Sequence, residues 1–331
     1  MKLVDMHCDT ISEIYEKKKE GRDVSLQKGG CKVTVRGLQD SCTMLQCFAM
    51  FVNLKKHREE AYAYANALID TFDQELKENP GLSLVKSYGD ILENQRLGKI
   101  SAMLTLEEGE VIEGSLEKLK ALYDRGARMM TLTWNYENSL AFPNEVKVDS
   151  KGRFYMVPDT TRGLTKRGFE AVAYMQELGM VVDVSHLSDR GIFDVLKIAK
   201  KPFVASHSNA RAMASHPRNL TDEMIRRMAE GGCVAGLNFY PGFLSDHFTG
   251  RKKISYVEDC ISMVKYMLRV GGSDFPALGS DYDGFEEELE WRDASGTPVL
   301  IEAMERAGIP GAQIDKITHE NALRVLRETL S

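Results

Sequence analysis

Imidazole and carboxylate side chains follow several short apolar segments of the sequence. The first case is the stretch DMHCDT, where His7 and Asp9 come directly after the apolar start of the chain. Their i, i+2 spacing places both side chains on the same side of an extended strand. The residues of this kind are His7, Asp9, Glu107, His186, His207 and Asp281. Side chains of these types bind dications, so the pattern indicates a metal site.

Each of these residues, taken alone, has a simpler explanation. An isolated histidine and aspartate two residues apart can form a polar turn, and a carboxylate after a strand can cap the next helix. The joint pattern favours a common site, because five predicted strands end in these side chains. Two-histidine, carboxylate-rich sets suit zinc, and a shared carboxylate suits two ions about 3.5 Å apart. The sequence therefore predicts a site for two zinc ions.

These side chains can meet only if the strands that carry them are parallel and adjacent. Strands are predicted at 2–6, 44–51, 100–106, 128–133, 180–184, 202–206, 233–239 and 276–280, and helices at 58–78, 115–125, 165–178, 188–199, 220–230 and 255–270. Alternating strands and helices form parallel sheets with crossover helices. Eight such units predict an α/β fold of the (β/α)₈ TIM-barrel type. A doubly wound open sheet is the alternative, but no glycine-rich dinucleotide loop follows the first strand.

The chain is longer than a minimal barrel. Its 331 residues exceed the roughly 250 of a typical barrel, so loop insertions are expected at 15–43, 79–98, 135–164 and 284–296. No repeat, low-complexity tract or flexible linker marks a boundary. Residues 1–331 are therefore predicted to form a single TIM-barrel domain.

Composition and charge argue against several classes of partner. The net charge is −6, so there is no basic excess to neutralise nucleic-acid phosphates. No segment approaches the roughly 20 apolar residues of a membrane span, and no secretory signal precedes Asp5. The six cysteines are scattered and are expected to be reduced thiols. A cytoplasmic protein with neither a nucleic-acid nor a membrane partner is predicted.

Several longer stretches resemble a known family, the renal (membrane) dipeptidases, which form peptidase family M19 within the amidohydrolase superfamily. The likeness covers nearly the whole chain, including MHCDT, LEEGEVIEGSLEKLKALYDRGARMMTLT, RGLTKRGFEAVAYMQELGMVVDVSHLS, PFVASHSNARAMASHPRNLTDEMI, VAGLNFY, GSDYDGF and ITHENALRVL. The combination of DVSH, ASHS and a following PRN is highly specific. The resemblance implies a (β/α)₈ fold, two zinc ions per chain and hydrolysis of dipeptides. Because family members are often dimers, it also suggests a homodimer.

The resemblance also implies roles for the residues at the strand ends. His7 and Asp9 would bind the first zinc ion, and Glu107 would bridge both ions. His186 and His207 would hold the second ion.

Two further residues would complete the chemistry that the resemblance implies. Asp281 matches the carboxylate that moves the proton from the attacking water to the leaving amine. A water between two zinc ions loses its proton near neutral pH and becomes a hydroxide nucleophile. Arg218 matches the residue that binds the substrate's C-terminal carboxylate, for which a planar guanidinium is well shaped.

The sequence departs from the family after the fourth strand. Many members have a histidine after TLT that stabilises the developing oxyanion, whereas here Trp134 and Asn135 follow. Either side chain could donate to the oxyanion, or Trp134 could simply form a wall of the pocket. Tyr240, in NFY after the seventh strand, could contact the substrate or pack in the wall.

Two other functions remain open from the residues alone. One is an amidohydrolase that acts on an N-acyl amino acid, a cyclic amide or a lactone, since this fold hosts many reactions. The other is a binding protein whose catalytic site has decayed. His57, His247 and His319 are expected to be structural or superficial, and His216 is expected to be a loop histidine. Cys8 is expected in the core, and Asp283 is expected to orient the loop around Asp281.

Overall fold

Eight parallel strands form a closed barrel in the computed structural model, which describes residues 2–246 and 253–330. The barrel strands are β1 (Leu3–Asp5), β2 (Thr43–Phe51), β4 (Ile100–Glu107), β5 (Ala127–Thr131), β8 (Val181–Asp183), β9 (Val204–Ala205), β10 (Val234–Leu237) and β12 (Pro276–Leu278). Each strand pairs in parallel with the next in this order, and β12 pairs with β1 to close the ring. Every predicted strand segment overlaps one of them, so the predicted fold class is confirmed.

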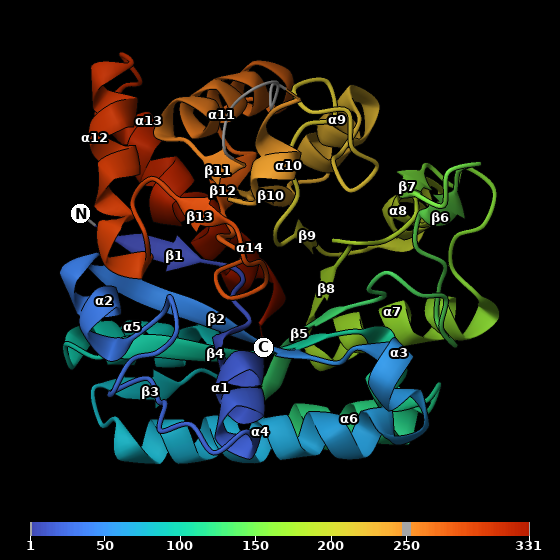
Figure 1. The fold of residues 1–331 in the computed structure, drawn as a ribbon, viewed down its shortest axis with the longest axis horizontal. Helices are drawn as coiled ribbons and strands as arrows, with labels where there is room; N and C mark the ends of the chain where they lie inside the picture. Colours follow the sequence, from blue (N-terminus) through green and yellow to red (C-terminus); the bar gives the residue numbers. More distant parts are fainter. Residues whose placement is uncertain (1, 247–252, 331) are drawn as a thin grey trace.

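Helices surround the barrel (Figure 1). The six predicted helices correspond to α4 (Ala61–Glu78), α6 (Leu116–Arg125), α7 (Lys166–Leu178), α8 (Asp189–Ile198), α9 (Asp222–Glu230) and α11 (Val257–Gly271). Further helices, which were not predicted, include α1 (Thr10–Lys19), α5 (Tyr88–Arg96), α12 (Pro298–Arg306) and α14 (Asn321–Thr329). The sequence of α1, TISEIYEKKK, is largely polar after its first turn, so its apolar pattern is too short to be recognised.

A compact apolar cluster fills the barrel and determines which end remains for chemistry. It contains one residue from every barrel strand: Val4, Leu45, Met103, Met129, Val181, Val204, Val234 and Ala277. Most of these lie in the first half of their strands. Ala322 and Val325 of α14 belong to the same cluster, so this helix covers the amino-terminal end of the barrel. The carboxyl ends of the strands are therefore the open end, as in other barrels of this type.

The predicted insertions carry small elements of their own. The segment 79–98 holds β3 (Leu82–Leu84), which pairs with the start of β4, and α5. The segment 135–164 holds an antiparallel hairpin of β6 (Glu145–Val148) and β7 (Phe154–Val157), at the right edge of Figure 1. Strand β13 (Glu288–Leu289) pairs with β11 (Ile254–Ser255). None of the helices in the described part of the chain is both long enough and apolar enough to cross a bilayer.

Candidate metal centre and substrate pocket

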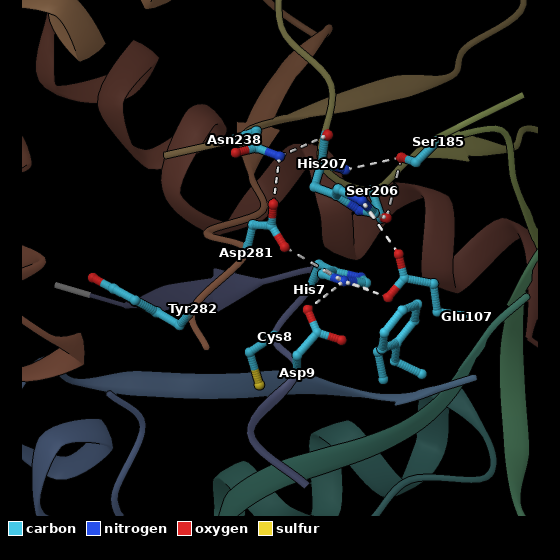
Figure 2. A network of polar contacts seen from close by, with 12 residues as sticks. His7, Cys8, Asp9, Glu107, Ser185, Ser206, His207, Asn238, Asp281 and Tyr282 are labelled. Carbon is cyan, nitrogen blue, oxygen red and sulfur yellow. Dashed lines mark hydrogen bonds and ion pairs between the residues drawn. The ribbon is translucent and has the colours of Figure 1, made fainter. Parts of the chain in front are cut away.

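The six side chains singled out from the sequence meet at the carboxyl ends of the strands. The structure forms three overlapping groups, in each of which the potential ligand atoms lie within 4.8 Å of one another. The groups are His7, Asp9 and Glu107; Glu107, His186 and His207; and His7, His207 and Asp281. Figure 2 shows five of these residues directed toward a common centre, with Cys8 and Tyr282 pointing away from it.

Glu107 joins the two halves of this cluster. Its Oε2 lies 3.3 Å from His7 Nε2, and its Oε1 lies 3.1 Å from His186 Nε2 and 3.8 Å from His207 Nε2. Asp9 Oδ2 lies 3.4 Å from His7 Nε2 on the first side. One carboxylate thus presents a separate oxygen to each half, as a ligand shared by two ions would.

The histidines of the second half have their ring nitrogens arranged for a common partner. His186 Nε2 and His207 Nε2 lie 2.9 Å apart, and both rings are buried. His186 Nδ1 lies 3.0 Å from Asn135 Oδ1, which can only accept a hydrogen bond. That contact assigns the proton of His186 to Nδ1 and leaves the lone pair of Nε2 facing the cluster.

The donor set fits a pair of dications. His7 Nε2 and Asp9 Oδ1 are buried and have no hydrogen-bond partner among the described residues. Asp9, Glu107 and Asp281 are all at least partly buried, and none forms an ion pair with a lysine or arginine in the described part of the chain. Buried carboxylates without a cation are unfavourable, so a bound positive charge would stabilise this arrangement. Imidazole nitrogens with carboxylate oxygens are the ligand types that zinc prefers.

Burial and mutual repulsion shift the proton affinities in the cluster. Burial, together with the neighbouring carboxylates, raises the pKa of Asp9 and of Asp281 to about 7. Burial opposes protonation of His7, but Glu107 and Asp9 raise its pKa well above the ordinary value. Burial lowers the pKa of His186 and His207 well below the ordinary value, which leaves both rings neutral and able to bind metal.

Removing bound metal with a chelator is expected to lower the melting temperature more at about pH 7.5 than at about pH 5.5. Without metal, the folded-state pKa of Asp9 and Asp281 lies above the ordinary value of 3.8. Their contribution to stability is then present at low pH and is lost as the pH rises from about 4 to about 7. Thermal melts with and without chelator at both pH values test this. An equal or larger decrease at the lower pH would contradict it.

Asp281 lies where the eighth barrel strand ends, at the edge of the cluster. Its Oδ2 accepts a hydrogen bond of 2.9 Å from Asn238 Nδ2, and its Oδ1 lies 3.9 Å from His7 Nε2. Both Asp281 and His186 have left-handed backbone conformations, with φ of 61° and 69°. Such conformations cost about 1–3 kcal/mol and persist where the surroundings impose them, which is common at functional sites.

A cavity of about 440 Å³ opens onto the cluster, and Arg218 lines it. The Arg218 side chain is buried, and burial lowers its pKa to about 10. Nη1 and Nη2 donate to Ser208 Oγ at 3.2 Å and to the His207 carbonyl at 3.3 Å, while Nε has no partner. No carboxylate of the described residues forms an ion pair with this guanidinium. A buried, unpaired guanidinium in a cavity is suited to an anionic ligand.

The loop after β5 forms one wall of the cavity. Trp134 packs edge-on against Phe51 at a centroid distance of 4.9 Å, and its ring lies 6.0 Å from that of His186. Glu108 holds this loop, because Oε2 accepts the Trp134 backbone N–H at 2.9 Å and Oε1 accepts the Asn138 side-chain amide. Glu108 itself is fully buried, and burial raises its pKa to about 7.

Tyr240 directly precedes α10 (Pro241–Leu244) and also lines the cavity. Its hydroxyl accepts a hydrogen bond of 2.6 Å from Lys253 Nζ, and its ring packs against Phe243 and Phe285. The side chain therefore has neighbours that keep it in the wall, with part of it facing the cavity.

Two histidines to which no functional role was assigned, His57 and His216, line the cavity. His216 lies in a loop, as expected. His57 stacks on Tyr64 at 3.8 Å, and His216 Nδ1 accepts the Arg218 backbone N–H at 3.1 Å. Their sequence neighbourhoods carried no signal, because they reach the cavity from separate segments. His57 ends α3 (Leu54–His57), which follows β2, and His216 lies in the loop after β9. His319, in the segment before α14, is not among the lining residues, and His247 lies outside the described residues.

Two other expectations agree with the structure. The Cys8 side chain is fully buried and its thiol donates to the Cys47 carbonyl at 3.4 Å. Asp283 accepts hydrogen bonds from the Thr10 hydroxyl at 2.6 Å and from the Lys32 backbone at 2.8 Å. Asp283 thus connects the loop after β12 to the start of α1 and to the segment that contains Lys32.

Comparison with known proteins adds independent findings. The family model described as "Membrane dipeptidase (Peptidase family M19)" matches residues 1–331. An uncharacterised protein of Klebsiella pneumoniae is 36% identical over 74% of this chain and 88% of its own length. An uncharacterised dipeptidase of Schizosaccharomyces pombe is 34% identical over 70% of this chain, and Dipeptidase 3 of Rattus norvegicus is 28% identical over 98% of it. The aligned parts make up 54% and 64% of these two longer proteins.

Solved structures show the same fold. A dipeptidase described as a metallopeptidase of family M19 superposes with a TM-score of 0.90 over 100% of this chain and 99% of its own, at 23% identity. A metallopeptidase of Rhodobacter sphaeroides, solved with a phosphinate mimic of L-Ala-D-Ala, gives 0.88 over 99% of both chains, also at 23% identity. Together with the match over the full length, these findings show that the chain belongs to the membrane dipeptidase family of metallopeptidases, peptidase family M19.

Proposed function

We propose that this protein is a zinc-dependent dipeptidase that holds two zinc ions per chain. The observation that carries the proposal is the position of Glu107, whose two carboxylate oxygens face separate groups of imidazole nitrogens. His7 and Asp9 would hold one ion with Glu107, and His186 and His207 would hold the other with it. Bound zinc would lower the pKa of a water to near neutrality and polarise the scissile carbonyl.

The protein's own side chains would move the proton. Asp281 is the carboxylate at the edge of the cluster whose second oxygen is held by Asn238. In this position it can accept the proton of the attacking water and then donate it to the leaving amine, as a general base and acid. Its left-handed backbone and the Asn238 contact keep the side chain in place before substrate binds.

Trp134 and Asn135 stand where many family members have the histidine that stabilises the oxyanion, but their contacts suggest other roles. The side-chain oxygen of Asn135 is directed at His186 Nδ1, so Asn135 would orient that histidine. Trp134 would form the wall beside it through its contact with Phe51. Polarisation of the carbonyl would then depend chiefly on the metal ions.

Dipeptides are the proposed substrates because a free carboxylate suits Arg218. The guanidinium is buried and has an unpartnered Nε, and it lines the same cavity as Glu107 and Asp281. A C-terminal D-residue is included, since the related Rhodobacter sphaeroides enzyme was solved with a mimic of L-Ala-D-Ala. The preferred side chains, a homodimer and a cytoplasmic location stay predictions.

Replacing Arg218 by methionine is expected to raise the KM for dipeptides by roughly 30-fold or more, with a smaller effect on kcat. Methionine keeps the length of the side chain but removes the charge-assisted hydrogen bonds to the substrate carboxylate. Steady-state kinetics on a panel of L,L- and L,D-dipeptides, with the zinc-loaded wild-type protein as reference, provide the measurement. A dipeptide amide, which lacks the carboxylate, serves as the control, and its KM should change little between the wild type and the variant.

The same panel separates the two other functions. An amidohydrolase for neutral cyclic amides or lactones would leave dipeptides uncleaved and would not respond to Arg218→Met. An N-acyl amino acid keeps the carboxylate but lacks the free amine of a dipeptide. An enzyme for N-acyl amino acids would therefore cleave substrates without a free amine, whereas a dipeptidase would require that amine. A decayed binding protein would cleave nothing, even with about two zinc ions bound per chain.

A further inference from the structure

Asp183 is a fully buried carboxylate at the end of β8 that the proposed reaction does not use. Its Oδ1 accepts hydrogen bonds from the backbone N–H groups of Ser185 and Ser206, both at 2.9 Å. Its Oδ2 accepts from the hydroxyls of Thr131 and Ser206, at 2.7 and 2.5 Å. Four donors from β5 and from the ends of β8 and β9 therefore converge on this side chain.

Ser206 connects this carboxylate to the candidate metal ligand His207. Its Oγ lies 2.7 Å from His207 Nδ1. Figure 2 labels both residues at the cluster. The single hydroxyl proton of Ser206 is used in the bond to Asp183, since a carboxylate can only accept. Oγ must then accept from His207 Nδ1, so that nitrogen carries the ring proton. His207 Nε2 is left with its lone pair directed at the cluster.

A similar arrangement occurs on the other side of the cluster. Asp5 Oδ1 accepts from the backbone N–H of Ser280 at 2.8 Å and of His7 at 3.3 Å, and its Oδ2 accepts from the Ser280 hydroxyl at 2.6 Å. Ser280 directly precedes Asp281, as Ser206 directly precedes His207. Each buried aspartate thus ties two adjacent strand ends that carry candidate site residues. Only Asp183 also determines the proton position of an imidazole.

We propose that Asp183 is a positioning residue which, acting through the Ser206 hydroxyl, keeps His207 in the tautomer that can bind metal. The inference rests on the proposed function in so far as His207 is a zinc ligand. Outer hydrogen-bond partners of metal-binding histidines fix the ring orientation and tautomer, and their loss typically weakens metal binding by about 10–100-fold.

The substitution Asp183→Asn reverses the direction of the hydrogen bonds. The asparagine amide can donate to Ser206 Oγ, which frees the hydroxyl proton to donate to His207 Nδ1. The ring proton then resides on Nε2, where it blocks the lone pair. An aspartate-to-asparagine change next to a histidine is known to produce the wrong tautomer in this way.

The test is a pair of measurements on the full-length protein. Nitrogen-15 NMR of the histidines in metal-free protein reports the tautomer of His207, which burial keeps neutral by lowering its pKa. The wild type should show a protonated Nδ1, and Asp183→Asn a protonated Nε2. Zinc affinity, measured by competition with a chelating dye, should fall about 10–100-fold for one of the two ions. Asp5→Asn, the same change at the other aspartate, should leave the His207 tautomer as in the wild type.

Ser206→Ala provides a second variant in case Asp183→Asn does not fold. It removes the acceptor of His207 Nδ1 but leaves the backbone N–H bond to Asp183, so a mixture of tautomers and about 10-fold weaker zinc binding are expected. A protonated Nδ1 in Asp183→Asn, or unchanged zinc affinity in both variants, would overturn the proposal. A wild-type protein that binds no zinc would refute the proposed function. The NMR measurement is made without metal, so its result would still decide whether Asp183 determines the His207 tautomer.

Discussion

Glu107→Gln is expected to reduce bound zinc from about two ions per chain to one or fewer and to lower kcat/KM by at least about 10³-fold. In the structure, Oε2 of Glu107 faces His7 and Oε1 faces His186, so each oxygen serves one half of the cluster. A glutamine keeps the shape but replaces one oxygen by an amide nitrogen, which donates hydrogen bonds and does not bind zinc. Elemental analysis and steady-state kinetics on the same preparation measure both effects.

The neighbouring residue offers a matched control. Glu108 is also a buried carboxylate at the end of β4, but its oxygens accept hydrogen bonds from the backbone of Trp134 and from the side chain of Asn138. Glu108→Gln should therefore retain both zinc ions, although the wall of the cavity can shift. If Glu107→Gln kept two zinc ions and more than about a third of the activity, a shared ligand at this position would be excluded.

Asp281→Asn is expected to lower kcat by about 10²–10⁴-fold with little change in KM or zinc content. Asparagine tolerates the left-handed backbone conformation at this position and its oxygen can still accept from Asn238, so the fold around it should persist. What it cannot do is take up a proton and release it to the leaving amine. The zinc content distinguishes this role from direct metal binding, because loss of a ligand would also lower the zinc content.

Asp283→Asn is the corresponding control two residues away. Its carboxylate accepts from Thr10 and from the Lys32 backbone, so it holds the loop and does not belong to any of the three ligand groups. A modest loss of stability with kcat within about tenfold of wild type is expected. An equal loss of kcat in both variants would show that Asp281 acts by holding the loop.

The barrel was predictable because its strands are buried on both faces. Strands β2 and β4 are mostly apolar runs, TMLQCFAMF and ISAMLTLE, with nearly every residue buried. Such runs can be recognised in the sequence without knowing which strands pair with them. By contrast, β6 is largely exposed and α1 is largely polar after its first turn, so their patterns are weak. The β6–β7 hairpin lies in a segment that was expected only as an insertion, and α1 was not predicted.

The contacts that adjust the site were not predictable from the sequence. Asn135 lies 51 residues before His186, and Asp183 lies 23 residues before Ser206, yet each pair is in hydrogen-bond contact. His57 and His216 likewise reach the cavity from separate segments of the chain. Hydrogen-bonding capacity is a property of residue type, but which donor meets which acceptor depends on how the strand ends and loops are arranged around the ring.

The sequence by itself determined the eight apolar segments that form the strands and the residue types at their carboxyl ends. Both are local properties: apolar runs specify buried strands, and parallel strands in a barrel bring their ends to one face. Only the tertiary structure decided that Glu107 presents one oxygen to each half of the cluster. It also decided that Asn135 contacts the ring of His186, and that Ser206, which is bonded to Asp183, contacts the ring of His207. Those features depend on distances of about 3 Å between side chains far apart in the chain, which no local pattern records.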